Sequence, residues 1–572
     1  MHPHTLALLL FCCAAPWAGA QIPYAQSADY ESYPSGIATG GGFADINGDG
    51  FLDLVVANGN DIQRQKLDVF YNDGTGRFPT QPSWSSADRD YHGHLAIGDV
   101  NADGWPDVAV SVFLGSGGFG DLGHVKLYLN QGGALESLPS WRSADEFYSF
   151  SCAFGDADGD GDLDLAVATG EPYFGPTAQN RIYFNAGGSL NTAPGWLSNP
   201  LDHTMDVAFG DVDNDGDLDL AFATAKGPTR VFYQGVNGMS TTAGFTATDN
   251  AAQNGNTCHW VDLDADGFLE LAVSDNDQLS GGSGNFKVYG NSNGALQTTP
   301  IWSDFGGYVS SIAAADLLRD GYPEIAGGLW WGGAWIYNNA TGQPGSASSW
   351  ESAKNSVSEA IFFGDLDNRG LREQTFAIAS NGGKAYRLPE APVHRILGVS
   401  VDGVPLARSQ YCADPAAGWV ALDRSPQVGV QITAAWSDEL DMGMTNWDSS
   451  VGNQLWYRSP IIAPALTALG STTLMPGDAL DVRLDLESTA ASSQDFVWAV
   501  VALPPAGPYR VVETAPGSLA GLASQSLTRS YPIPAQVPPG LRGSWELLFA
   551  VFRTTVSPGS ISAEARLSFS IL

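Results

Sequence analysis

The chain has 572 residues and is strongly acidic, with 62 Asp and Glu against 26 Lys and Arg and a net charge of −36. A surface of this charge argues against DNA, RNA or an anionic membrane as a partner, because each of them repels it. Beyond the first 20 residues no stretch approaches the roughly 18 consecutive apolar residues of a membrane span, so no membrane insertion is expected.

The N-terminus has the pattern of a secretory signal peptide. Residues 1–20 contain an apolar core, Leu6 to Phe11, and end in the small residues Ala18-Gly19-Ala20, which predicts cleavage after Ala20. We therefore expect export, to the medium, the cell surface or the periplasm. Three cysteines remain after cleavage, and an odd number predicts buried apolar residues rather than a disulfide framework.

Next in the chain, Tyr24 to Asp29 is similar to two later segments, Trp84 to Asp88 and Trp141 to Asp145. Both later segments lie where the outer strand of a repeat is expected. The N-terminus is therefore predicted to supply an outer strand that completes the last repeat and protects its edge.

An acidic loop recurs along the first two thirds of the chain, most clearly from Asp156 to Asp164. Oxygen ligands at positions 1, 3, 5, 7 (a backbone carbonyl) and 9, with Gly at position 6, suit Ca²⁺. Each pair of carboxylates about 4 Å apart repels by roughly 4 kcal/mol at an effective dielectric constant near 20, so the loop needs a cation. Five copies are well formed, with side-chain ligands Asp45, Asn47, Asp49 and Asp53; Asp99, Asn101, Asp103 and Asp107; Asp156, Asp158, Asp160 and Asp164; Asp211, Asp213, Asp215 and Asp219; Asp262, Asp264, Asp266 and Glu270.

Two further copies are degraded. The set Asp316, Asp320 and Glu324 has Leu318 at position 3, and the set Asp365, Asp367 and Glu373 has Arg369 at position 5. We expect about five Ca²⁺ ions in the well-formed loops and little or none in these two. An EF-hand is excluded, because the last acid stands at position 9 rather than 12 and an apolar strand follows it.

The first Asp of each loop follows that of the previous loop by 49 to 57 residues. A period near 50 with four short strands per copy is typical of a β-propeller blade. An apolar residue precedes each loop by two positions and is predicted to pack between blades: Phe43, Ile97, Phe154, Phe209, Trp260, Ala314 and Phe363. Seven copies predict seven blades, and eight remain an alternative because Leu440 to Tyr457 resembles part of a further repeat.

These loops and their period resemble bacterial secreted proteins with FG-GAP/VCBS repeats, the repeat class of the integrin α-subunit propeller. The resemblance covers about residues 24–388 and implies an all-β propeller with Ca²⁺ in its Asp-x-Asp-x-Asp-Gly-x-x-Asp turns. It does not specify a function, because such repeats occur in adhesins, lectins, lyases and many uncharacterised proteins.

The domain boundaries follow from changes in composition. Residues 21–389 are predicted to form the propeller and 390–459 a small β insertion with a degenerate repeat segment. Residues 460–572 have short apolar strands and Pro-Gly turns, which favour an immunoglobulin-like β-sandwich.

The face opposite the metal turns is the predicted ligand-binding face. Aromatic and polar residues gather where the connections of this face are expected, and such side chains stack on sugars or contact peptides. The candidates are Tyr91, His92, His94, Tyr148, His203, Asn254, Tyr308, Trp330 and Trp331.

The sequence favours an adhesion or carbohydrate/protein-binding module, with a glycan or an extracellular protein as partner. One alternative is a polysaccharide lyase that uses a Tyr or His base on this face, and another is a structural surface protein without a small ligand. No residue is assigned a catalytic role, because no nucleophile elbow, zinc-binding His pair or P-loop is present.

Overall fold

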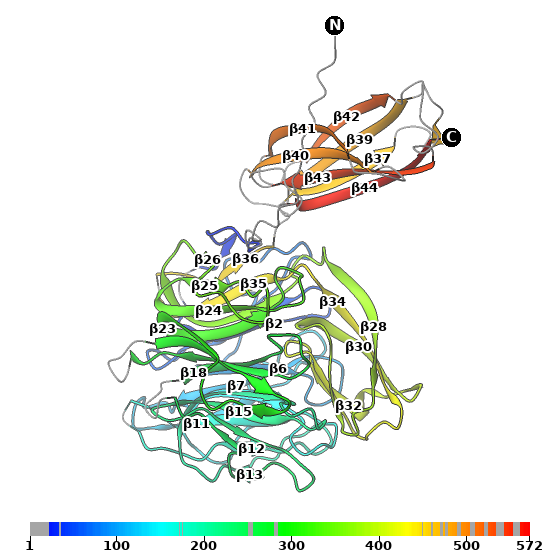
Figure 1. Cartoon of the computed structure of the whole chain (residues 1–572). Coiled ribbons are helices and arrows are strands. Elements are labelled where there is room, and N and C mark those ends of the chain that lie inside the picture. Colours follow the sequence, from blue (N-terminus) through cyan, green and yellow to red (C-terminus); the bar gives the residue numbers. More distant parts are fainter. Residues whose placement is uncertain are drawn as a thin grey trace. The chain divides into compact units, whose positions relative to one another are not determined.

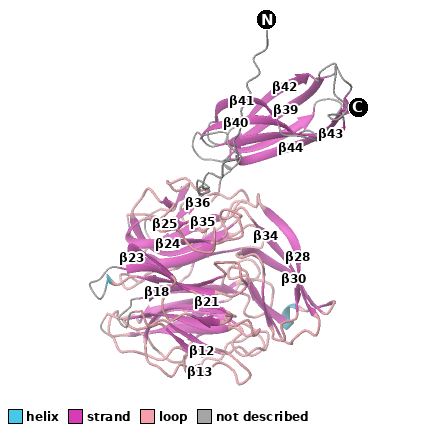
Figure 2. Cartoon of the chain, in the orientation of Figure 1, coloured by secondary structure: helices cyan, strands magenta, loops and turns pink. Residues whose placement is uncertain are grey.

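The computed structural model describes residues 22–458, except 34–35, 171, 174, 250–254, 279–283 and 449, and the strands within residues 462–571. The predicted signal peptide and the candidate Asn254 therefore lie outside the described residues. Two compact units are present, Pro23–Ser459 and a second within Pro460–Leu572. Both consist of strands (Figure 2), and the 3-10 helix η2 (Arg408–Gln410) has three residues. The all-β prediction is confirmed.

Outside residues 371–437, the described strands of Pro23–Ser459 group into seven antiparallel units of four strands, four of them separate sheets and three joined in one larger sheet. Figure 1 labels strands of these units. The first four units are β2 (Ala38–Ala44), β3 (Asp53–Asn58), β4 (Leu67–Phe70), β5 (Trp84–Ser85); β6 (Tyr91–Gly98), β7 (Asp107–Leu114), β8 (Leu122–Tyr128), β9 (Trp141–Arg142); β10 (Ser149–Gly155), β11 (Asp164–Thr169), β12 (Arg181–Tyr183), β13 (Trp196–Leu197); and β14 (His203–Gly210), β15 (Asp219–Ala225), β16 (Arg230–Phe232), β17 (Phe245–Thr246). In each unit the acidic loop joins the first strand to the second, as the pattern predicts.

The next two units share a long strand. The fifth comprises β18 (Gly255–Val261), β19 (Glu270–Asp275), β20 (Gly284–Tyr289) and the first half of β23 (Trp302–Ala315), and the short hairpin β21 (Asn291–Ser292) and β22 (Ala295–Leu296) follows β20. The sixth comprises the second half of β23, β24 (Glu324–Gly332), β25 (Ala334–Tyr337) and β26 (Trp350–Glu351).

The seventh unit is assembled from three distant parts of the chain. It comprises β27 (Ser356–Gly364), β35 (Asp441–Asn446), β36 (Gln454–Trp456) and the N-terminal β1 (Tyr30–Glu31), whose Tyr30 lies opposite Leu455. The N-terminus thus supplies the outer strand of this unit as predicted, but through Tyr30–Glu31 and not through the predicted segment Tyr24 to Asp29. Residues 440–457, which suggested an eighth repeat, supply strands of this unit.

An inserted domain separates β27 from β35. Its strands form two small sheets, β28 (Leu371–Ala379), β34 (Gly429–Ser437), β30 (Val393–Val401), β31 (Val404–Pro405) in one and β29 (Ala385–Arg387), β33 (Trp419–Leu422), β32 (Tyr411–Asp414) in the other. Apolar residues such as Tyr386, Val420 and Ile432 form a core of their own between the sheets. The insertion therefore begins at residue 371, and the boundary placed at 389/390 from sequence falls inside it.

Contacts between neighbouring units run in a cycle. The first strands contact one another in the order β2, β6, β10, β14, β18, β23 and β27, and β27 contacts β2. Glycine permits close approach between these strands, because a Cβ at Gly155 would lie 2.4 Å from the ring of Phe209. The same relation joins the last unit to the first, where a Cβ at Gly364 would lie 3.1 Å from the ring of Phe43.

A buried side chain, an amide in six units and the Arg458 guanidinium in the seventh, links each unit to the preceding one. The residue two positions after the third strand donates from this side chain to the carbonyl at position 2 of the preceding unit's acidic loop. The pairs are Asn130 to Ile46 (2.8 Å), Asn185 to Val100 (2.8 Å), Asn291 to Val212 (2.8 Å), Asn339 to Leu263 (2.8 Å) and Asn72 to Leu366 (2.7 Å). With its amide oriented to pair with its neighbours, Gln234 donates to the carbonyl of Ala157 (2.9 Å). Arg458 donates from Nη1 to the carbonyl of Leu317. The Asn72 bond joins the first unit to the seventh.

The second compact unit has two sheets. One contains β37 (Ile462–Ala468), β39 (Ala479–Ser488) and β42 (Ser524–Pro532), and the other β38 (Thr473–Leu474), β44 (Ile561–Ile571), β43 (Gly543–Phe552), β40 (Gln494–Leu503) and β41 (Arg510–Leu519). The sheets contact each other through β37 and β44. A two-sheet β architecture is present, and its immunoglobulin-like nature stays a prediction.

Candidate metal centres and binding face

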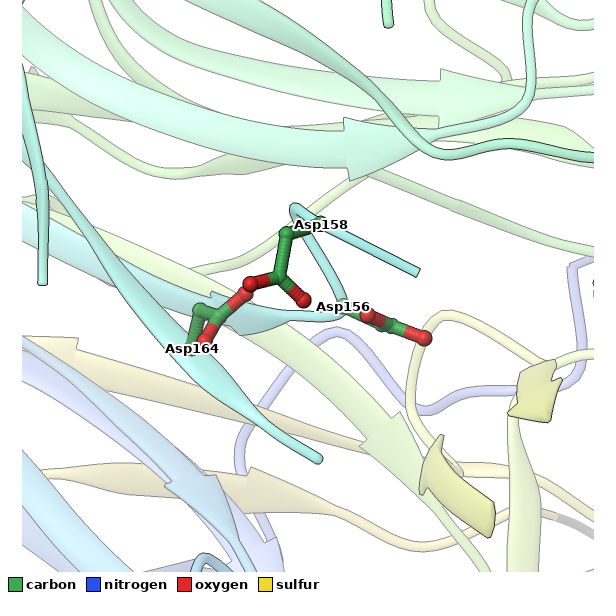
Figure 3. A group of neighbouring side chains, drawn as sticks. All are labelled: Asp156, Asp158 and Asp164. Atoms are coloured by element: carbon green, nitrogen blue, oxygen red, sulfur yellow. The ribbon is translucent and has the colours of Figure 1, made fainter. Parts of the chain in front are cut away.

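The acidic loops share one network of hydrogen bonds, illustrated by the loop of the third unit. The Gly161 N–H donates to Asp156 at position 1 (3.0 Å). The two oxygens of Asp164, at position 9, accept from the N–H groups of Ala157 (2.8 Å) and Asn185 (2.7 Å). Figure 3 shows the carboxylates of Asp156, Asp158 and Asp164 close together, and this network holds them there.

Three of the well-formed loops bring carboxylate oxygens within 4.8 Å of one another. The groups are Asp156, Asp158 and Asp164; Asp211, Asp213 and Asp219; and Asp262, Asp264 and Glu270. They comprise positions 1, 3 and 9, without the position-5 aspartates Asp160, Asp215 and Asp266. The loops of the first and second units have Asn47 and Asn101 at position 3, which offer an amide oxygen instead of a carboxylate.

The donor set fits a hard divalent cation. The Oδ1 atoms of Asp45, Asp211 and Asp262, all at position 1, are buried and accept no hydrogen bond from the protein. Burial, reinforced by the neighbouring carboxylates, raises the pKa of Asp211 to about 7 and that of Asp219 to about 9. A loop with these acids ionised is stable only with a bound cation, and oxygen-only donors suit Ca²⁺.

The seventh loop differs from the sequence-based interpretation. Glu373 does not stand at position 9, because it lies in β28 and is exposed. Asp441, 68 residues later, takes this position: its oxygens accept from the N–H groups of Leu366 (2.9 Å) and Arg458 (2.6 Å), as in the other loops. Asp365, Asp367 and Asp441 therefore form a fourth carboxylate group. The inserted domain lies between positions 6 and 9, which hides the motif in the sequence.

Arg369 brings a positive charge into this seventh loop. Its Nε lies 2.6 Å from Asp367, and its Nη2 donates to the carbonyl of Arg458 (3.2 Å). The guanidinium stands at position 5, where well-formed loops carry a carboxylate. In the sixth loop the Leu317 N–H donates to Glu324 (2.8 Å) as expected, but Leu318 supplies no oxygen at position 3.

The predicted ligand-binding residues Tyr91 and Tyr148 lie in one aromatic cluster. Both are half-buried against Phe113, Phe150 and Met205. Phe119 contacts Phe113 edge-on at a centroid distance of 6.4 Å. Because Phe119 is 46% exposed, the cluster extends to the protein surface.

The predicted histidines occupy three environments. His92 is fully buried with Nδ1 2.8 Å from the carbonyl of Asn58, and burial lowers its pKa to about 3. His94 lines a cavity between the first strands, and its Nδ1 lies 3.7 Å from Asp206. His203 is half-buried at the start of β14. His92 is thus packed as a core residue in this structure.

A second aromatic cluster contains Tyr308, Trp330 and Trp331. Tyr308 pairs with Trp330 across β23 and β24, at the strand ends remote from the acidic loop. Trp331 is 54% exposed and has a φ of +58°, and its ring lies edge-on to Tyr308 (5.7 Å) and Trp330 (6.0 Å). Two partners were missed by the sequence reasoning: Trp447, edge-on to Trp330 (5.7 Å), and the buried Glu359, which accepts from Trp330 Nε1 (2.8 Å). Neither belongs to a recognisable motif.

A central cavity of about 820 Å³ is lined by the first strands and by the inserted domain. Small residues such as Gly41, Ala153 and Ala313 line its wall, and Arg387, His394 and Arg408 of the insertion line it together with residues of the acidic loops. Among the described residues, no helix is long and apolar enough to span a membrane.

Comparison with known families agrees with this geometry. The profile of the FG-GAP-like repeat matches residues 45–110 and 112–167. The chain contains FG-GAP-like repeats. These repeats include the acidic loops of the first three units, and such repeats are typical of extracellular proteins. No curated protein matches the chain significantly in sequence.

Among solved structures, the chain is similar to the alkylpurine DNA glycosylase AlkC of Pseudomonas fluorescens (18% identity, TM-score 0.16) over 19% of this chain and 30% of that one. It is also similar to the CARDB domain of the PF1109 protein of Pyrococcus furiosus (12% identity, TM-score 0.15), covering 19% of this chain and 91% of that one. The sporulation control protein Spo0M of Bacillus subtilis shows 8% identity and a TM-score of 0.16, covering 19% and 49%. Likeness at this level carries no conclusion about fold or function.

Proposed function

We propose that the chain is a secreted, Ca²⁺-stabilised seven-bladed β-propeller that binds carbohydrate on the face opposite its acidic loops. The cyclic contacts of the seven units and the Asn72 bond support the ring. The buried carboxylate oxygens at position 1 of the loops, which accept no hydrogen bond, support the proposal of a bound cation. The propeller would hold the binding face rigid, and the C-terminal sandwich would be an accessory domain.

The observation that carries the binding function is the conformation of Trp331. A bulky residue with positive φ costs of order 1–3 kcal/mol, and such strain persists mainly where the surroundings enforce it, often at ligand sites. Here Tyr308 and Trp330 support the indole from the side, so that more than half of the residue faces solvent. A rigid, exposed aromatic ring is suited to stack on the apolar face of a sugar.

A glycan array probed with the wild type and with Trp331→Ala tests this function. We expect glycan binding by the wild type and at least a tenfold loss in the variant, with a Tm within about 1 °C because the side chain is largely exposed. Phe305→Ala is the matched control, since Phe305 is 59% exposed on β23, the strand that carries Tyr308, and is not part of the cluster.

Other outcomes would redirect the proposal. Equal glycan binding by Trp331→Ala and Phe305→Ala would reject this site. Unsaturated, shortened products from a bound polysaccharide would identify a lyase instead. Binding to extracellular proteins without any glycan binding would make the chain a protein adhesin.

A further inference from the structure

The inserted domain contacts five of the acidic loops that it does not itself interrupt. On loops one and two, His394 Nε2 lies 3.1 Å from the Gly50 carbonyl, and Arg408 Nε donates to Asp99 (3.0 Å). On loops three and four, Lys384 donates from Nζ to the Gly159 carbonyl and from its backbone N–H to the Gly216 carbonyl. On loop five, Arg387 Nη2 donates to Asp262 (2.7 Å).

The acidic loops differ in the positive side chains that the inserted domain places against them and in their own number of acidic residues. Arg408 and Arg387 bond directly to the position-1 aspartates of loops two and five, through the Oδ2 atoms of Asp99 (3.0 Å) and Asp262 (2.7 Å), whereas Arg395 lies farther, 3.9 Å, from Asp45 of loop one. Lys384 instead bonds a carbonyl of loop three. Loops three and four carry five acidic residues each, every second residue from 156 to 164 and from 211 to 219, whereas loop two carries three and loop five carries four.

This distribution sets the order of cation affinity. Affinity for Ca²⁺ rises with the negative charge of the ligands. A guanidinium that shares a carboxylate with a divalent cation repels that cation. For charges of +1 and +2 about 5 Å apart in water, this repulsion lowers the binding constant of the cation by at least about tenfold. Arginine therefore opposes Ca²⁺ in loops two and five, while it partly neutralises these loops when no cation is bound.

We propose that the inserted domain divides the calcium sites into two classes, with Arg408 and Arg387 acting as resident counter-ions that weaken loops two and five relative to loops three and four. This inference rests on the Ca²⁺ binding proposed above. Ca²⁺ binding at the weak loops and the arginine contacts oppose each other, so the calcium concentration also influences how firmly the insertion is held on the loops.

The test is calorimetric titration of the chelated full-length protein with Ca²⁺, for the wild type and for the double variant Arg387→Gln/Arg408→Gln. The wild type is expected to show two classes of sites. In the variant the weak class should tighten by at least about tenfold at unchanged stoichiometry, and the Tm in chelator should fall because two counter-ions are lost. Arg424→Gln is the control, since Arg424 pairs with Asp423 within the insertion (3.6 Å).

Each contrary outcome is distinct. A weak class that is unchanged or weaker in the double variant would show that the arginines orient the aspartates rather than compete with the cation. A single class in the wild type would overturn the inference while Ca²⁺ binding stands. Absence of Ca²⁺ binding to the wild type would overturn the proposed metal sites and the inference together.

Discussion

Replacing Asn72 by Ala removes a buried hydrogen bond between the first repeat and the seventh, the one to the carbonyl of Leu366. The Asn72 side chain is 4% exposed and makes four hydrogen bonds. Its Nδ2 donates to the carbonyls of Leu366 (2.7 Å) and Leu52 (3.1 Å), and its Oδ1 accepts from the N–H groups of Gly74 (3.1 Å) and Gly76 (3.0 Å). At about 1 kcal/mol each, their loss should lower the free energy of unfolding by about 4 kcal/mol.

The size of the unit converts this loss into a modest thermal shift. An unfolding entropy of about 2 cal/mol/K per residue over roughly 430 residues predicts a Tm decrease of about 4 °C, if the unit unfolds cooperatively. Differential scanning calorimetry in excess Ca²⁺ would measure it. Asn72→Asp retains the acceptor for the glycine N–H groups but loses both donations from Nδ2, to Leu366 and to Leu52, which separates the donated hydrogen bonds from the accepted ones.

Asn185→Ala provides the matched comparison, because Asn185 makes the same bonds between the third and second units, including 2.8 Å to the carbonyl of Val100. Similar decreases for Asn72→Ala and Asn185→Ala would show that the junction between the ends of the ring is as tight as an internal one. A full decrease for Asn185→Ala with less than about 1 °C for Asn72→Ala would refute the closed ring.

Three further predictions concern the metal loops and the packing between units. In chelator, the Tm should fall as pH rises from about 4 to about 7. Burial raises the pKa of acids such as Asp156 to about 7 in the folded state, so stability is lost as they ionise. Saturating Ca²⁺ should abolish this dependence, and a pH-independent Tm in chelator would contradict the prediction. Arg369→Asp should add one Ca²⁺ equivalent in equilibrium dialysis, because it restores the position-5 ligand of the seventh loop; an unchanged stoichiometry would show that the interrupted loop is not a metal frame. Gly155→Ala should lower the free energy of unfolding by about 1–3 kcal/mol in denaturant titration, because its Cβ would overlap the ring of Phe209, whereas Gly398→Ala, with open space around the new atom, should have little effect.

Much of the fold was predictable because local chemistry repeats. The acidic loop, the apolar strand after it and the spacing between copies are short-range signals, and they identified the first two strands of the six repeats whose loops are uninterrupted. The sequence also predicted that the N-terminus supplies the outer strand of the last repeat, because that repeat would otherwise leave an open edge. The similarity of Tyr24 to Asp29 to later segments placed this strand too early in the chain, since the strand is Tyr30–Glu31.

The seventh repeat and the binding face depended on tertiary structure. Asp441 completes a loop that starts at Asp365, and no local pattern connects them, because the inserted domain separates positions 6 and 9. The contacts of Arg387 and Arg408 with the loops depend on how that domain packs, which its composition does not reveal. The sequence by itself determined which residues repeat and which donor atoms they offer; the three-dimensional packing decided which distant carboxylates meet, which cations reach them and which aromatic rings remain exposed.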